Sequence, residues 1–263
     1  MADFATEDDV ISAPAQRVNF VKTATRTSVA AAWFSVFDLA GFPGAGTLAG
    51  AGANGAVVDD TTTGFPPLNA FGGGAVGRIK RLKFSSSVAC TIKLFDCLWK
   101  GGAYAFNANQ AVTAGSYSAR LPGTDYKGLE IWAETVTAAT GNQTWNVTYT
   151  DQDGNPGATT GATGIGAAPT LGRCWQLPLA AGDSGVQTVT NVAGGTGSAG
   201  TANILVLRPL GEGRIKIAND QDLQDYLQTG MPQVFDTSAL MILVAADSTS
   251  TGIPDVKIDI ANK

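Results

Sequence analysis

The chain of 263 residues contains no histidine. This absence excludes Ser-His-Asp and Cys-His nucleophile activation, histidine-bearing zinc sites and the usual acid/base group that titrates near neutral pH. Charged residues make up only 15% of the chain, and no two carboxylates stand out as a catalytic pair. We therefore expect no catalytic residues, no metal site and no cofactor, and we expect that the protein is not an enzyme.

Cysteine is also scarce. Three thiols cannot all pair within one chain, which favours a reducing compartment and free thiols at Cys90, Cys97 and Cys174, in or near the core. No run approaches the roughly 18 apolar residues of a membrane helix, and the acidic N-terminus lacks the apolar segment of a secretion signal. We expect synthesis in a cytoplasm and no membrane partner.

Two short motifs are rejected on their context. Gly72 to Gly77 satisfies G-x-G-x-x-G, but Pro66-Pro67 precede it and an alternating strand follows it, so we expect no dinucleotide binding. Asp151 to Asn155 lacks the spacing of a calcium loop and is typical of a turn. The net charge of -5 disfavours nonspecific binding of nucleic acid.

The chain is rich in the residues of short strands and turns. Glycine is frequent, at 33 residues, and valine, isoleucine, threonine and aromatic residues occur in short alternating runs. Residues 78–84 and 88–94 predict a hairpin. One short helix is predicted with Asn219 as its cap and Gly230 just beyond its end. The pattern predicts an all-β fold of sandwich or jelly-roll type.

An internal repeat divides the chain. The skeleton D-x-x-G-x-P-G-A occurs at 38–45 and again at 151–158. Other segments match at offsets of 110 to 112: Ile92, Leu94 and Leu98 fall on Ile204, Val206 and Leu210, residues 129–132 fall on 240–243, and Trp145, Val147 and Tyr149 fall on Val256, Ile258 and Ile260. Side-chain types agree better than identities, as expected when packing is retained.

The repeat predicts two tandem β domains, at 29–148 and 149–263. Residues 1–28 match nothing in the second half, so we interpret them as an extended N-terminal arm. Its start is acidic, and the remainder, with Val18-Asn19-Phe20-Val21, could add as a strand. Two alternatives remain for this segment: an arm that reaches a neighbouring subunit, or a frayed terminus.

Basic residues gather in the first copy. Arg78, Lys80, Arg81 and Lys83 lie within one predicted strand, whereas its counterpart at 186–192 carries no charge. The asymmetry indicates that the two copies face different partners, with the basic strand as a candidate contact for an acidic surface. A solvated strand face is the alternative explanation.

Several segments resemble virion proteins encoded near the capsid genes of tailed bacteriophages. They are residues 172–179 with 181–185, residues 205–210, and residues 231–236. The resemblance extends over most of the chain from about Arg17 and carries no catalytic motif. It implies a structural protein of the virion, most plausibly a head-decoration or cement protein on the capsid surface. Its implied partners are the major capsid protein and, because such proteins often form trimers, further copies of itself as a homotrimer.

Two other functions stay open at this point. A tail or fibre-base component, or a carbohydrate-binding adhesin module, would use loop aromatics such as Tyr104, Phe106 and Tyr117 to stack on sugars. The main shell protein is disfavoured, because the duplicated all-β pattern differs from the α+β shell fold of tailed phages. Trp33, Trp132 and Trp145 are expected in the core, and Trp99 is expected at an exposed loop.

Overall fold

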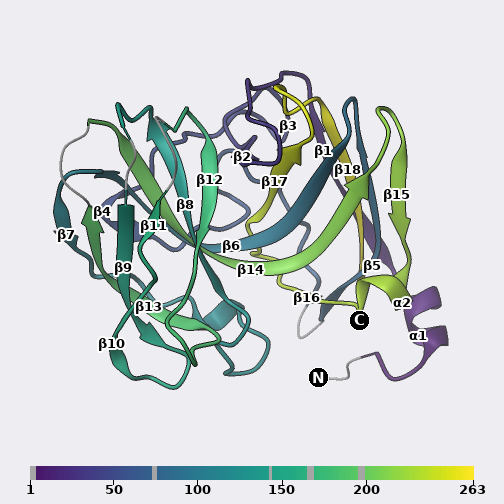
Figure 1. The fold of residues 1–263 in the computed structure, drawn as a ribbon. Helices are drawn as coiled ribbons and strands as arrows, with labels where there is room; N and C mark the ends of the chain where they lie inside the picture. The colour runs from purple at the N-terminus through teal and green to yellow at the C-terminus, as the bar shows by residue number, and fades with distance from the viewer. Residues whose placement is uncertain (1–3, 73–75, 142–143, 165–168, 195–198) are drawn as a thin grey trace.

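Antiparallel β-sheets account for most of the ordered structure in a computed structural model of the chain (Figure 1). The structure describes residues 4–72, 76–141, 144–164, 169–194 and 199–263. Helical segments within these ranges are short: α1 (Glu7–Ser12), α2 (Tyr226–Thr229) and a 3₁₀ turn, η1 (Ser118–Arg120). The predicted all-β class is confirmed.

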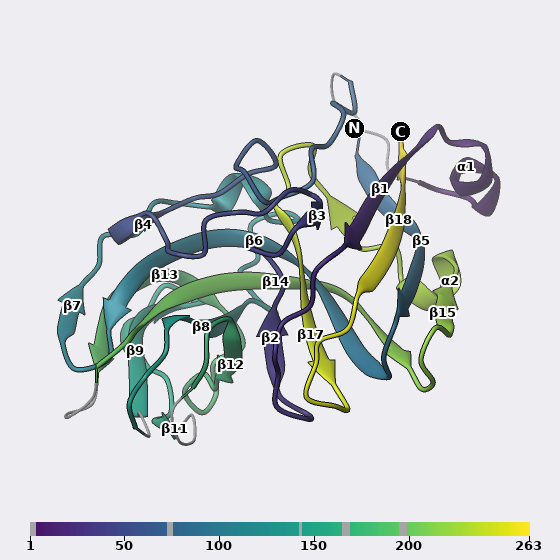
Figure 2. The ribbon, with the colours of Figure 1, turned by 90° about the horizontal axis from the view of Figure 1, so that it is seen from above.

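The central sheet closes on itself as a barrel. Its strands follow the order β14 (Thr201–Ile215), β8 (Glu130–Thr137), β12 (Arg173–Leu177), β2 (Trp33–Ser35), β17 (Leu240–Ala246) and β6 (Cys90–Ala105), and β6 pairs again with β14. β4 (Gly52–Ala56) adds to β6 outside the ring. Figures 1 and 2 show the long strands β6 and β14 crossing the whole molecule.

A flanking sheet lies at each end of these long strands. Flanking sheet 1 has the order β15 (Gln221–Gln224), β5 (Gly77–Ser86), β18 (Pro254–Asn262), β1 (Ala15–Lys22) and β3 (Gly41–Phe42), with β16 (Gln233–Val234) beside β5. Flanking sheet 2 has the order β10 (Pro156–Thr159), β9 (Thr144–Asp151), β13 (Val186–Gly194) and β7 (Asn109–Ala111), with β11 (Thr163–Gly164) beside β9.

Three apolar clusters fill the spaces that this arrangement creates. One packs flanking sheet 2 against the barrel and includes Trp99, Trp145 and Tyr149. A second packs flanking sheet 1 against the barrel and includes Phe84 and Ile258. The third brings together inward side chains of the barrel strands, listed here as Phe95, Cys97, Trp132, Cys174, Leu205, Leu207, Met241 and Leu243. The three cores share β6 and β14, whose successive side chains point to opposite faces.

Strand pairing supports the duplication through an approximate twofold relation. Ile131 of β8 pairs with Val206 of β14, and Ile242 of β17 pairs with Leu94 of β6. Ile242 is the counterpart of Ile131 at an offset of 111, and Leu94 is the counterpart of Val206 at an offset of 112. The second pair is therefore the repeat of the first. Likewise Trp175–Ala133 corresponds to Phe34–Val244. The repeat therefore runs β1, β2, β5, β6, β8, β9 and then β10, β12, β13, β14, β17, β18.

The two copies exchange strands instead of forming separate domains. β5 of the first copy pairs with β18 of the second, β13 of the second pairs with β9 of the first, and β6 pairs with β14. The predicted division at 148/149 cuts through β9. The boundary marks a repeat of sequence, but strand pairing does not follow the domains predicted at 29–148 and 149–263.

The predicted N-terminal arm is wrong for residues 15–22, which form a strand within the fold of the same chain. Residues 15–22 form β1, which pairs with β18 from Ala15 to Val21 and buries Val18 and Phe20. β1 has a counterpart in β10: Arg17 pairs with Asp259, and Thr159 pairs with Thr148. Sequence comparison misses this relation because the connection from β1 to β5 differs in length from that between β10 and β13.

The D-x-x-G-x-P-G-A motif is not part of the structural repeat. Asp38 follows β2, whereas Asp151 ends β9, and the counterparts of these strands are β12 and β18. The two aspartates also act differently: Asp38 pairs with Arg26, and Asp151 accepts hydrogen bonds from the backbone N–H groups of Asp153 and Asn155 at 2.8 and 2.9 Å. Turn-forming residues after a strand recur for local reasons.

Candidate functional site

The four predicted contact residues separate in the folded chain. Ile79, Leu82 and Phe84 of β5 point into the core and are fully buried. Arg81 and Lys83 lie on the opposite, outward face, where they line a shallow hollow of about 290 Å³. Arg17, Lys257, Asp259, Gln221 and Leu223 complete its lining. The sequence does not identify Arg17 and Lys257 as part of this surface, because they lie in β1 and β18, which are far from β5 in the chain.

Lys80 and Arg78 lie outside this hollow. Lys80 Nζ approaches the Val10 carbonyl of α1 at 3.4 Å, and an Arg78 Nη donates to the Met231 carbonyl at 3.3 Å. A register shift between Asp259 and Ile260 marks an irregularity in β5 at this level. The basic strand therefore does not present its four cations as one row, and whether any of them contacts a partner stays a prediction.

Asp259 holds the two arginines of the hollow together. Arg17 donates from Nε and Nη2 to the two carboxylate oxygens at 2.7 and 3.1 Å, and Arg81 donates from Nε at 2.7 Å. Burial alone would raise the pKa of Asp259, but the hydrogen bonds from Arg17 and Arg81 outweigh it and lower this pKa. The cluster therefore keeps its charge at neutral pH.

Lys83 and Lys257 occupy directly opposite positions on β5 and β18. Like charges at such positions are destabilising, because the side chains of opposed residues lie side by side. Lys257 Nζ lies 3.9 Å from Asp255, and Lys83 has no hydrogen bond or ion pair among the described residues. Their other cross-strand neighbours, Leu223 and Asn19, are neutral.

The duplicated fold supplies a neutral version of the same surface. The positions of Lys83 and Lys257 correspond to Ala193 and Asn146, which pair on β13 and β9. Those of Arg81, Asp259 and Arg17 correspond to the neutral residues Asn191, Thr148 and Thr159. The scaffold forms this sheet without the charges, so packing alone does not explain them.

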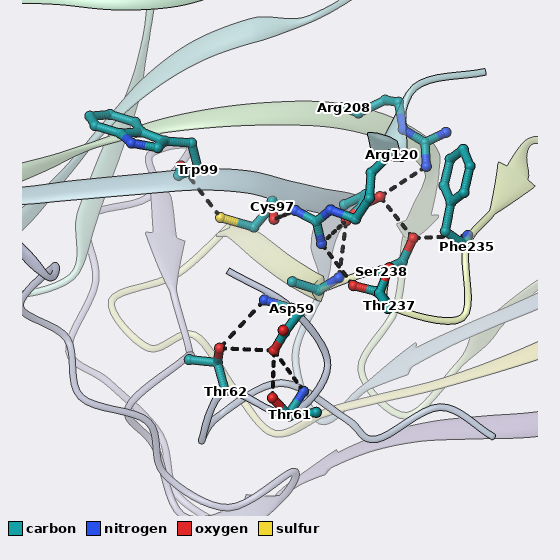
Figure 3. A network of polar contacts seen from close by, with 12 residues as sticks. Asp59, Thr61, Thr62, Cys97, Trp99, Arg120, Arg208, Phe235, Thr237 and Ser238 are labelled. Atoms are coloured by element: carbon teal, nitrogen blue, oxygen red, sulfur yellow. Dashed lines mark hydrogen bonds and ion pairs between the residues drawn. The ribbon is translucent and has the colours of Figure 1, made fainter. Parts of the chain in front are cut away.

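A buried ionic network lies where β6 pairs with β14. Asp96, opposite Arg208 in the strand register, is fully buried. It accepts hydrogen bonds from Arg208 Nη2 at 2.9 Å and Ser238 Oγ at 2.8 Å. Arg120 lies 3.4 Å from the other carboxylate oxygen and donates to the carbonyls of Thr237 and Cys97 at 2.9 and 2.7 Å (Figure 3). These contacts join the barrel to the segment that contains η1 and to the loop that precedes β17.

A second buried pair lies beneath the loop that includes β4. Lys100 Nζ is 3.4 Å from Glu134, and Asn203 donates to the same carboxylate at 2.7 Å and to the Leu48 carbonyl at 2.6 Å. Lys100 also lines a hollow of about 470 Å³ whose other walls are apolar or threonine side chains. Since its ammonium already contacts Glu134 and the ring of Phe37, the arrangement anchors the loop.

Lys22 anchors the loop at 38–45. Its buried Nζ donates to the carbonyls of Leu39 and Pro43 at 3.1 and 2.8 Å. Burial lowers the pKa of Lys22 to about 8, with Asp38 opposing the change.

The lowered pKa of Lys22 predicts how the stability of the protein changes at alkaline pH. Between about 8 and the ordinary value of 10.5, the unfolded chain holds a proton at Lys22 that the folded chain has lost. The contribution of Lys22 to stability therefore rises with pH, by at most about 1.4 kcal/mol per pH unit. Urea denaturation of the protein and of Lys22→Met at pH 7.5 to 10 would measure it. A stability difference between the two that stays constant would contradict the prediction.

The aromatic residues proposed for sugar stacking are inside the molecule. Tyr104, Phe106 and Tyr117 have exposed fractions of 4%, 0% and 1%. Trp99, predicted at an exposed loop, is fully buried and donates from Nε1 to the Asn54 carbonyl at 3.3 Å. Tyr104 lies in β6, which continues to Ala105. Phe106 follows β6 and Tyr117 precedes η1, but both side chains pack into the core between flanking sheet 2 and the barrel. The adhesin alternative thus loses the side chains on which it depended.

Other sequence expectations have mixed outcomes. Trp132 and Trp145 are buried, Trp33 is half-buried, and Cys90, Cys97 and Cys174 are buried free thiols. The predicted helix is shorter than expected, with Asp225 as its cap, because residues 221–224 form β15. Residues 73–75 of the rejected G-x-G-x-x-G motif lie outside the described residues.

Metal-binding clusters and membrane-spanning helices are both absent from the described part of the chain. No group of three or more cysteine, aspartate or glutamate side chains there could hold a metal ion. Within the same ranges, none of the helices has the length and apolar character needed to cross a bilayer.

No protein-family model matches the chain, and no curated protein matches it. Among solved structures, it is similar to that of the infectious bursal disease virus Gx strain, with 12% identity over 94% of this chain and 80% of that chain and a TM-score of 0.16. The VP2 subviral particle of the same virus gives 10% identity, coverages of 95% and 80%, and a TM-score of 0.16. At TM-scores this low the likeness carries no argument about fold or function.

Proposed function

We propose that the protein is a structural component of a tailed-phage virion, a decoration or cement protein that binds the outer surface of the head and stabilises it. The observation that carries this proposal is the charged hollow on flanking sheet 1. It is a surface feature added to a scaffold whose second copy is neutral at every equivalent position. A role in binding another macromolecule explains this difference, and the sequence resemblance to phage virion proteins supplies the class of partner.

The architecture suits a load-bearing role. The exchanged strands tie the two copies into one body, and each flanking sheet packs on β6 and β14 through an apolar core, so force applied at one flanking sheet passes through these cores and the barrel to the other. Reinforcement of a shell requires such a rigid body and buried contact area on the order of 1,000 Å² or more at each junction. The major capsid protein is the proposed partner.

Self-association as a homotrimer is part of the same proposal. Each chain has two similar halves, so three chains around an axis would offer six related β modules, a pseudo-sixfold ring suited to a capsid lattice. Sedimentation velocity of the purified protein, and mass measurement of the protein released from particles, would test this. A monomer in both measurements would contradict the trimer but leave head binding open.

The head-binding proposal is tested on particles. Heads assembled without the protein should bind the purified chain at a fixed stoichiometry, and cryo-EM should place its density on the outer surface of the head. Decorated heads should release their DNA at a higher temperature than bare heads. Density confined to the tail or fibre base would support the alternative position, and no density on either would reject a virion role.

A further inference from the structure

We propose that the hollow on flanking sheet 1 binds an acidic segment of its partner, whose carboxylates pair with Lys83 and Lys257 while an apolar side chain contacts Leu223. The inference rests on the proposed function, in which the partner is the shell protein. It goes further by naming the residues that bind and the chemistry that they recognise, and it leaves Arg78 and Lys80 outside the site.

The charge of the hollow is unbalanced. Four cations, Arg17, Arg81, Lys83 and Lys257, line it together with one carboxylate, Asp259. Both oxygens of that carboxylate already accept hydrogen bonds from Arg17 and Arg81. Lys257 Nζ also lies 3.9 Å from Asp255, which is beyond hydrogen-bond distance. The ammonium groups of Lys83 and Lys257 therefore keep donors available for an external acceptor, and a carboxylate between them would remove the repulsion of two opposed cations.

The second copy of the fold indicates that this repulsion has a function. Ala193 and Asn146 occupy the corresponding positions on flanking sheet 2 and form the same cross-strand pair without charge. Two opposed lysines are expected to lower the stability of flanking sheet 1, whereas flanking sheet 2 forms the equivalent pair without that cost. Departures of this kind from local stability are expected at binding sites.

The surroundings favour a protein partner over a nucleic acid. Leu223 lies directly opposite Lys83 on the edge strand β15 and is 52% exposed, so an apolar contact adjoins the cations. The whole chain carries a net charge of -5, which repels an extended phosphate backbone beyond this small hollow. An acidic segment with interspersed apolar residues complements both features.

Fluorescence anisotropy with labelled peptides tests the proposal. The probe is a ten-residue peptide of alternating glutamate and valine, compared with alternating glutamine and valine and with a ten-nucleotide oligothymidine. We expect the protein to bind the glutamate peptide and neither of the other two probes. This binding should weaken as the salt concentration is raised. The variant Lys83→Ala with Lys257→Asn, which copies flanking sheet 2, should bind the glutamate peptide at least ~10-fold more weakly. Lys127→Ala, at a residue that pairs with Gly185 beside flanking sheet 2, should change binding less than about twofold.

A thermal melt separates loss of the site from loss of the fold. The double variant should melt at the same temperature as the parent protein or higher, because it removes a repulsive pair. Unchanged peptide binding by this variant, no binding by the parent protein, or preference for the oligonucleotide would each overturn the proposal. A lower melting temperature would overturn the argument that the lysines are present at a cost to stability.

Particles distinguish this inference from the proposed function. If the double variant decorates heads as well as the parent protein does, the acidic-segment inference fails and head binding stands. If neither protein binds heads although the peptide result holds, the proposed function fails and the hollow remains an acceptor-binding site for another acidic protein.

Discussion

The two halves of the chain, residues 1–151 and 152–263, are expected to remain unfolded when each is produced alone. Each half would carry strands whose partners lie in the other: β5 needs β18, β13 needs β9, and β6 needs β14. Separation would expose the inward faces of both flanking sheets and one side of the barrel. Circular dichroism and urea titration of each fragment should show no cooperative transition.

Mixing the two fragments provides the control. Co-refolding should recover β structure and yield an equimolar complex, since every strand again finds its partner. The intact protein should unfold in one calorimetric transition, because the three cores share β6 and β14. A fragment that unfolds cooperatively by itself, or two separate transitions in the intact chain, would show that the halves are independent domains.

Replacement of Asp96 by alanine is expected to lower the free energy of unfolding by about 3–5 kcal/mol. The substitution leaves the guanidinium groups of Arg208 and Arg120 buried without their carboxylate, and it removes the acceptor of Ser238 Oγ and of the Ala239 N–H. The cost of an unpaired buried charge far exceeds the net value of the pair itself. Urea denaturation monitored by tryptophan fluorescence would measure the change.

Asp247 is the matched control for this measurement. It pairs with Arg214 at 2.7 Å, but both side chains are more than 40% exposed. Exposed ion pairs contribute about 0–1 kcal/mol, so Asp247→Ala should have a small effect. Equal losses of stability from the two substitutions would mean that the Asp96 network does not hold the η1 segment and the loop before β17 to the barrel.

The sequence predicted the local features of this fold well. Alternation at 78–84 and 88–94 identifies β5 and the start of β6, but the hairpin predicted from these two strands is wrong, because β5 pairs with β18 and β15 whereas β6 pairs with β14 and β17. The offsets of 110 to 112 identify counterpart strands whose pairing registers agree. Such patterns are local, since a strand with one buried face requires an apolar residue at every second position. For the same reason, Trp132 and Trp145 were assigned to the core from their strands alone.

Assignments that depended on pairing between distant segments failed. The residues at 18–21 allow a strand within the predicted arm, but nothing in their own composition shows that the partner is β18 of the same chain. Sequence reasoning places Trp99, Tyr104 and Phe106 in loops, yet β6 continues through Gly101 and Gly102 to Ala105 against β14. Phe106 follows that strand, but its side chain is fully buried. Only two of the four basic residues of β5 belong to the hollow, since the irregularity at Lys80 separates them.

By itself, the sequence determined that this protein is all-β, that it is duplicated, and that one copy carries a basic strand whose counterpart in the other copy is uncharged. Alternation, repeat offset and charge are properties of residues near each other in the chain. Tertiary structure alone decided that the copies exchange strands around one barrel, and that Arg17 and Lys257 join Arg81 and Lys83 on one face. Register between strands some 170 or more residues apart sets these contacts, and it is fixed by how the whole sheet buries its apolar side.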